Sequence, residues 1–103
     1  MTHNDLYELF REYNIRNYCK GTYVPRNSQI KCHFLPKHGD EEVGSTGSAV
    51  INSVYEEMEE ENLKPNTIFG AYAALSRYFE FAVCQGEIAE NPVRYARSIR
   101  PDV

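Results

Sequence analysis

The segment between Pro65 and Gly86 constrains the fold of this chain more than any other part of the sequence. Apolar side chains recur there at helical spacing over about five turns. Pro65 suits the start of a helix, Asn66 or Thr67 can cap it, and glycine suits the left-handed residue that ends one. Apolar residues stand on more than one side, so we expect a long central helix. Its main stripe is Ile68, Tyr72, Leu75, Phe79, Ala82 and Val83.

Two other segments have helical periodicity. The first follows a candidate cap at Asn4 or Asp5 and runs to about Cys19. The other follows a candidate cap at Thr46 or Ser48. The apolar stripes are Leu6, Leu9, Phe10 and Tyr13 in the first, and Val50, Ile51, Val54, Tyr55 and Met58 in the other.

The remaining segments are less regular. Pro25 suits a helix start and Pro36 a helix end, so we expect a short helix over residues 26–35 and a surface loop over residues 37–45. Another short helix can begin after Pro92. Strand-like alternation is missing from the sequence. We therefore predict an all-α fold, a small orthogonal bundle of four main helices with a short C-terminal helix.

The cysteines Cys19, Cys32 and Cys84 form an odd set without a CxxC pair, which favours reduced thiols. We expect Cys84 to lie on the buried face of the long helix. A zinc site could combine the other two with His33 and His38, but their spacing matches no usual zinc pattern. We predict no metal or other cofactor. Because apolar runs are short and the N-terminus does not resemble a secretory signal, we expect a cytoplasmic protein without a membrane partner.

The net charge of −4 is unevenly distributed. Residues 38–62 hold eight Asp or Glu and no Lys or Arg, whereas the segments on either side are mildly basic. A nucleic acid responds to a basic face and not to the net charge of the protein. Five carboxylates within residues 56–61 could form a metal site or a partner-docking patch. A solvated helix face is the more usual outcome for such a charge run.

The stretch from Leu63 to Val93 resembles the last long helix of the core-binding domain of tyrosine recombinases, the phage integrase family. That domain has a SAM-like, all-helical fold, and its third helix begins at a capping threonine, as Thr46 can do here. The matching residues are Lys64, Thr67, Ala74-Leu75, Tyr78-Phe79, Phe81, Gly86, Ile88 and Asn91-Pro92. The resemblance implies a core-binding domain over residues 1–93 and the start of an interdomain linker over residues 94–103.

In such recombinases this domain clamps duplex DNA together with a separate catalytic domain. The resemblance therefore implies a non-catalytic domain whose partners are double-stranded DNA and other recombinase protomers. A helix fits the major groove, and a helix N-terminus offers free N–H groups to phosphate. The tail arginines suit a linker that crosses the DNA backbone. The candidate DNA contacts are Arg26, Asn27, Gln29, Lys31, Lys64, Asn66, Thr67, Arg77, Arg94 and Arg97.

Each candidate also has a plainer interpretation. Lys64 and Thr67 can be only a solvated lysine and a helix cap. Arg77 can pair with Glu80 or with acids of the preceding helix. The other basic residues can be ordinary solvated surface.

The alternative function is a helical protein–protein interaction module with no nucleic-acid role; a small regulator that accompanies a recombinase is a third possibility. Catalysis is not expected from these residues. None of the three histidines begins the His-x-x-Arg pattern of the recombinase catalytic domain. The sequence also contains no glycine-rich phosphate loop, no G-x-S-x-G and no HExxH motif.

Overall fold

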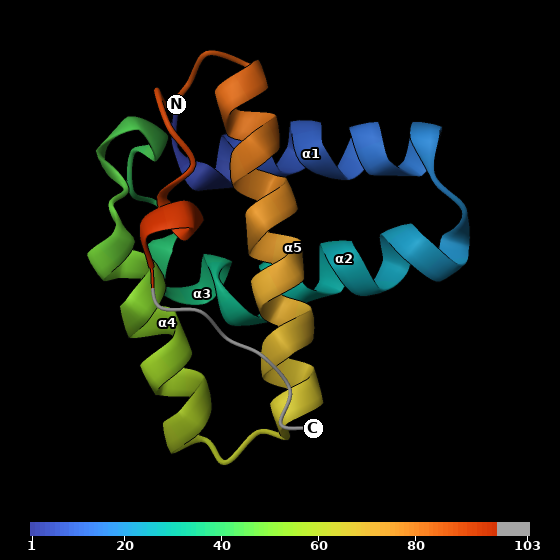
Figure 1. Ribbon diagram of the computed structural model, residues 1–103. Coiled ribbons are helices and arrows are strands. Elements are labelled where there is room, and N and C mark those ends of the chain that lie inside the picture. Colours follow the sequence, from blue (N-terminus) through green and yellow to red (C-terminus); the bar gives the residue numbers. More distant parts are fainter. Residues whose placement is uncertain (97–103) are drawn as a thin grey trace.

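The computed structural model describes residues 1–96, and this part of the chain is all-α (Figure 1). Within it, the only strand-like pairing is one isolated bridge between Thr2 and Glu42. Four main helices, as predicted, are joined by a one-turn helix and two 3-10 turns. They are α1 (His3–Asn17), α2 (Lys20–His33), α3 (Leu35–His38), η1 (Val43–Ser45), α4 (Ser48–Glu60), α5 (Pro65–Cys84) and η2 (Pro92–Tyr95). The short C-terminal helix that we expected is the 3-10 turn η2.

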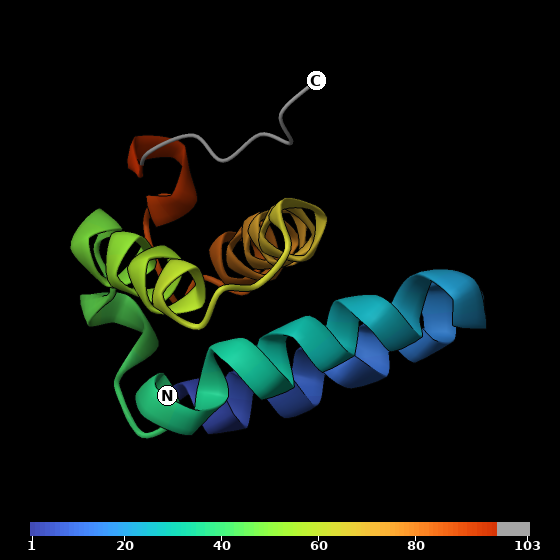
Figure 2. The ribbon, with the colours of Figure 1, turned by 90° about the horizontal axis from the view of Figure 1, so that it is seen from below.

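The long helix α5 is central, as its sequence predicted. It packs against α1, α2, α4 and η2. Helices α1 and α2 lie side by side as one layer, and α5 crosses that layer (Figures 1 and 2). Aromatic side chains fill the crossing region because their large apolar area gains most from burial. The fully buried aromatic residues are Phe10, Phe34, Tyr55, Tyr78 and Phe79.

The C-terminus of α5 ends as predicted. Gly86 has a φ of +75°, in the left-handed region that glycine adopts without steric cost. Its N–H donates to the Val83 carbonyl at 3.0 Å, and the N–H of Glu87 donates to the Ala82 carbonyl at 3.0 Å. This pair of hydrogen bonds is a Schellman motif, which satisfies two carbonyls at the end of the helix.

The predicted helix caps were wrong. Thr2, not Asn4 or Asp5, caps α1, since its hydroxyl accepts from the Asp5 N–H at 3.4 Å. Lys64 and Gly47 occupy the cap positions of α5 and α4, and neither helix has a side-chain cap. Pro65 explains the shift in α5: it stands at the first helical position, so Asn66 and Thr67 already lie inside the first turn. Thr46 is buried, and its hydroxyl forms a hydrogen bond with the His3 ring instead of capping α4.

The bounds of the second helix were also wrong. Helix α2 begins at Lys20 and continues through Pro25. Proline removes only the hydrogen bond to the carbonyl four residues before it, that of Gly21. Gly21 has open space around it and Pro25 is exposed, so water can satisfy that carbonyl. Pro36 lies at the start of α3 and does not simply end α2.

Two predictions of burial also failed. Leu9 and Tyr13 of the α1 stripe are exposed, although Leu6 and Phe10 are buried as expected. Cys84 is exposed, like the other two cysteines. It lines an open cleft between α1 and the end of α5 instead of packing in the core. Across residues 1–96, no helix is both long and apolar enough to cross a membrane.

Candidate nucleic-acid interface

An open groove of about 340 Å³ follows the crossing of α2 and α5. Small residues on α5 let the two helices approach closely and leave the groove hollow. The longer polar side chains along it come from both helices. The lining residues are Thr22, Pro25, Arg26 and Gln29 from α2, and Gly70, Ala73, Ala74 and Arg77 from α5.

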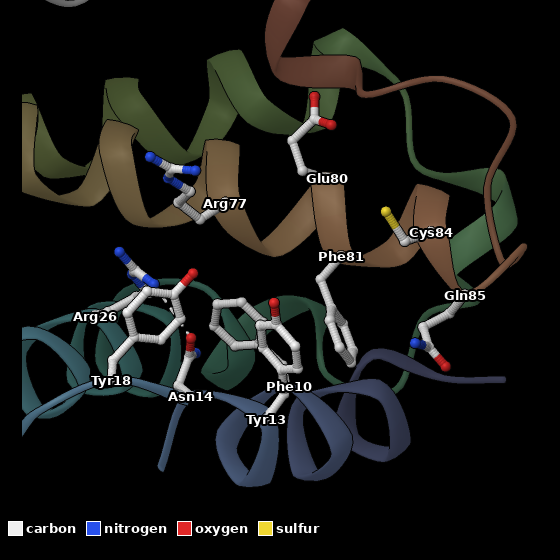
Figure 3. Close-up of a pocket in the computed structure, with 10 residues that line it drawn as sticks. All are labelled: Phe10, Tyr13, Asn14, Tyr18, Arg26, Arg77, Glu80, Phe81, Cys84 and Gln85. Atoms are coloured by element: carbon white, nitrogen blue, oxygen red, sulfur yellow. Dashed lines mark hydrogen bonds between the residues drawn. The ribbon is translucent and has the colours of Figure 1, made fainter. Parts of the chain in front are cut away.

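A smaller cleft of about 190 Å³ adjoins this groove, between α1 and the C-terminal half of α5 (Figure 3). Arg26 and Arg77 line both hollows, so two guanidinium groups stand at their junction. The two arginines come from different helices and are far apart in the sequence. The structure therefore brings together two of the predicted contact residues.

Arg26 is held in place by neutral groups. Its Nη1 donates to Asn14 Oδ1 at 3.2 Å, and its Cζ lies 4.6 Å from the centre of the Tyr18 ring. Asn14 is fully buried and donates from Nδ2 to Asn27 Oδ1 at 3.0 Å. Among residues 1–96, no carboxylate pairs with it, so the guanidinium is oriented without an ion pair that would offset its charge. Asn27, a predicted contact, is buried and supports Arg26 through Asn14.

Arg77 is exposed, and the predicted ion pair with Glu80 is absent. Glu80 Oε1 accepts from Asn91 Nδ2 at 3.1 Å instead. Among residues 1–96, Arg77 makes no ion pair within 4.0 Å, including with the acidic helix α4. Its guanidinium is therefore available at the junction of the two hollows (Figure 3).

Gln29 lies in the groove, half-buried, and its Oε1 has no hydrogen-bond partner among the described residues. Leaving a buried polar atom unpaired costs free energy, and a donor from a ligand would recover it. Lys31 is exposed but lies about 140° around the helix from Arg26. It therefore faces away from the groove.

The N-terminus of α5 offers fewer backbone donors than we expected. Pro65 has no N–H, and the N–H groups of Thr67 and Ile68 donate to the Lys64 carbonyl at 2.9 and 3.1 Å. The side chains of Lys64 and Asn66 are nevertheless exposed. Asn66 lies four residues before Gly70, which lines the groove, so both fall on one stripe of α5.

Of the predicted tail contacts, Arg94 lines neither the groove nor the cleft. Arg94 is exposed on η2, which packs on α4 and α5. Arg97, like Arg100, lies outside the described residues. Glu57 of the acidic helix pairs with Lys37 at 2.9 Å, and the other four carboxylates of residues 56–61 are exposed, as expected for a solvated face. Within residues 1–96, no three His, Cys, Asp or Glu side chains are grouped to hold a metal ion.

The sequence interpretation missed a buried polar cluster at the start of α1. His3 Nδ1 lies 2.8 Å from the Tyr78 hydroxyl and Nε2 lies 2.7 Å from Thr46 Oγ1. Burial lowers the pKa of His3 to about 4 and raises that of Tyr78. The His3 ring is fully enclosed, so the cluster is structural and not a site for a ligand.

Comparison with known proteins indicates the class of fold. No family model and no curated protein sequence matches the chain. A solved structure of a lambda integrase (75–356) dimer bound to a COC′ core site is similar to it, with a TM-score of 0.86 and 20% sequence identity. The match covers all of this chain and 36% of the integrase chain. The all-α, integrase-like fold that we predicted is thus confirmed, and this chain corresponds to about a third of that neighbour.

Proposed function

We propose that this chain is a double-stranded DNA-binding domain of a site-specific recombinase of the tyrosine recombinase class. Residues 1–93 would form its core-binding domain, and residues 94–103 would begin the linker to a separate catalytic domain. The observation that carries the proposal is the fold match along the whole chain to an integrase that is bound to DNA in its own structure. In this proposal the domain is not catalytic, and its other partners are further recombinase protomers.

The groove between α2 and α5 is the proposed DNA-binding surface. Arg26 and Arg77 would bind backbone phosphates, and Lys64 and Asn66 would extend that contact toward the start of α5. Gln29, with its unpaired Oε1, has the amide chemistry that can bind a base edge in the major groove. Asn27 would act indirectly, by holding Asn14 against Arg26.

The charge distribution supports this assignment. Helix α4, which carries the exposed carboxylates, lies on the opposite side of α5 from the α1–α2 turn (Figures 1 and 2). Repulsion between exposed charges is largely screened beyond about 8–10 Å at physiological salt. Among residues 1–96, neither Arg26 nor Arg77 makes an ion pair with a carboxylate of α4, so the acidic helix does not neutralise either arginine directly.

The alternative is a protein–protein interaction module, and the exposed carboxylates of α4 are the observation that favours it. Titration of a labelled DNA duplex at two salt concentrations, followed by fluorescence anisotropy, separates the two functions. The proposal predicts affinity that falls steeply as salt rises. Absence of binding at low salt, with a full helical circular dichroism spectrum, would refute it.

Substitution of single basic residues tests which surface binds DNA. Arg26→Ala and Arg77→Ala should each weaken binding and reduce the salt dependence by about one released ion. Lys37→Ala is the matched control, because it removes the same charge from α3, where Lys37 already pairs with Glu57. Equal effects of all three substitutions would indicate a general charge effect and contradict the groove assignment.

A further inference from the structure

The cleft beside Arg26 and Arg77 contains more aromatic surface than contact with duplex phosphates requires. Tyr13 lies 5.3 Å from Phe81 and 6.3 Å from Tyr18 between ring centres, so the rings form one continuous surface. Phe10 forms the floor, 5.6 Å from Phe81. Tyr13 and Tyr18 are 44% and 39% exposed. Aromatic side chains that line a hollow beside a few polar groups are typical of a binding site.

The polar groups of the cleft are segregated from this surface. The guanidinium groups of Arg26 and Arg77 stand at one end, and the Gln85 amide stands at the other (Figure 3). Glu80 also lines the cleft, but its carboxylate points away from the arginines and accepts from Asn91. The cleft therefore suits a ligand with an anionic group at one end and a flat, apolar ring beside it.

We propose that this cleft binds an unpaired nucleotide of the DNA held in the neighbouring groove. Its phosphate would lie at Arg26 and Arg77, and its base would stack on Tyr13 and Phe81. Bases of any sequence can stack on aromatic side chains, and arginine adds a cation–π contribution. This inference rests on the proposed function.

Continuity with the groove favours a nucleotide over a peptide. The same two arginines line both hollows, so a strand whose phosphates lie at the junction would place the next base at the mouth of the cleft. In a paired duplex that base is stacked inside the helix and cannot enter. An unpaired base can enter at little unstacking cost.

The test compares two labelled duplexes that differ only by one extrahelical purine, with fluorescence anisotropy as the readout. The wild-type chain should bind the bulged duplex about tenfold more tightly than the paired one. Tyr13→Leu and Phe81→Leu keep apolar volume but remove the planar ring. Each should abolish the preference while leaving affinity for the paired duplex unchanged. Phe69→Leu is the matched control, because Phe69 is exposed on α5 and does not line the cleft.

Every outcome of this experiment either supports or overturns the inference. Equal affinity of the wild-type chain for both duplexes, or a preference that survives both substitutions, overturns the inference and leaves the proposed function standing. Failure to bind either duplex at low salt overturns both. If Phe81→Leu loses its helical circular dichroism spectrum, the inference is tested by Tyr13→Leu alone, because Tyr13 is exposed. Displacement of the bulged duplex by a Glu-Phe dipeptide, but not by short single-stranded DNA, would assign the cleft to a protein partner and overturn the inference.

Discussion

His3 joins three parts of the fold and should make the stability of the domain sensitive to acid. Its ring lies between the Tyr78 hydroxyl of α5 and Thr46, and packs edge-on against Phe34 at 4.7 Å between ring centres. A neutral ring satisfies both contacts: Nε2–H donates to Thr46, whose hydroxyl can donate to the Glu42 carbonyl, and Nδ1 accepts from Tyr78. This tautomer is assigned from the hydrogen-bond network. A second ring proton would leave both contacts possible, because the Tyr78 hydroxyl can donate to the His3 carbonyl at 3.3 Å instead; burial of the positive charge is what opposes protonation.

The size of the effect follows from the pKa of His3. Burial lowers that pKa to about 4 from 6.5, with a smaller contribution from His38; nearby Glu41 and Glu42 act in the opposite direction. The unfolded chain therefore binds the proton more tightly than the folded one. The stabilisation is complete above pH 6.5 and is lost as the pH falls toward 4. Linkage gives a loss of about 2 kcal/mol by pH 5, approaching about 3 kcal/mol at lower pH.

Urea denaturation followed by circular dichroism at pH 7 and pH 5 measures this loss directly. His3→Gln has no titratable ring, so it should be less stable than the wild-type chain at pH 7 but should lose about 2 kcal/mol less between the two pH values. His33→Gln, on α2, is the control and should keep the full pH dependence. The reasoning is refuted if the wild-type chain and His3→Gln lose the same stability.

Three other predictions concern packing, backbone conformation and the support of Arg26. Leu75→Ala should lower the free energy of unfolding by about 2–5 kcal/mol, because Leu75 is buried in the core; a loss below about 1 kcal/mol in urea denaturation would contradict this. Gly86→Ala should lower the free energy of unfolding by about 1 kcal/mol, because Gly86 has a positive φ. Gly21→Ala should be neutral or stabilising, because Gly21 has open space around it. Shifts in melting temperature of equal size and sign for the two variants would contradict this. Asn14→Asp should weaken duplex binding in an anisotropy titration, because a carboxylate would neutralise Arg26; unchanged affinity with an unchanged helical spectrum would exclude that role.

The sequence predicted α5 well because its determinants are local. A proline, a helical stripe and a glycine in left-handed conformation fix the element within one segment. The predicted start of α2 was wrong because the proline rule considers one helix alone. In the structure, the packing of α2 against α1 and α5 offsets the single hydrogen bond that Pro25 removes at an exposed position. The predicted burial of Cys84 was wrong for a similar reason, since burial depends on which neighbours surround the last turn of α5.

The candidate site could be predicted only in part, for the same reason. Arg26 and Arg77 were each recognised as basic residues on helices, but their meeting depends on the crossing of α2 and α5. Tyr13 was assigned to the stripe of the first helix and Phe81 to the residues that carry the family resemblance, and their meeting in one cleft had no signature in sequence spacing. His3 was one of three scattered histidines, and its two partners are 43 and 75 residues away.

Arg26 is oriented by neutral groups, and this helps to explain why a net charge of −4 is compatible with the proposed function. A basic side chain can be oriented by a carboxylate, which cancels its field, or by a neutral amide and an aromatic ring, which do not. Arg26 has the second kind of support from Asn14 and Tyr18, and Arg77 makes no ion pair among the described residues. Four of the fifteen carboxylates lie on α4, and Glu12, Glu41 and Glu42 pair with Arg16, His38 and the N-terminus. In the proposed function, attraction for phosphate would therefore depend on these two guanidinium groups and not on the net charge of the protein.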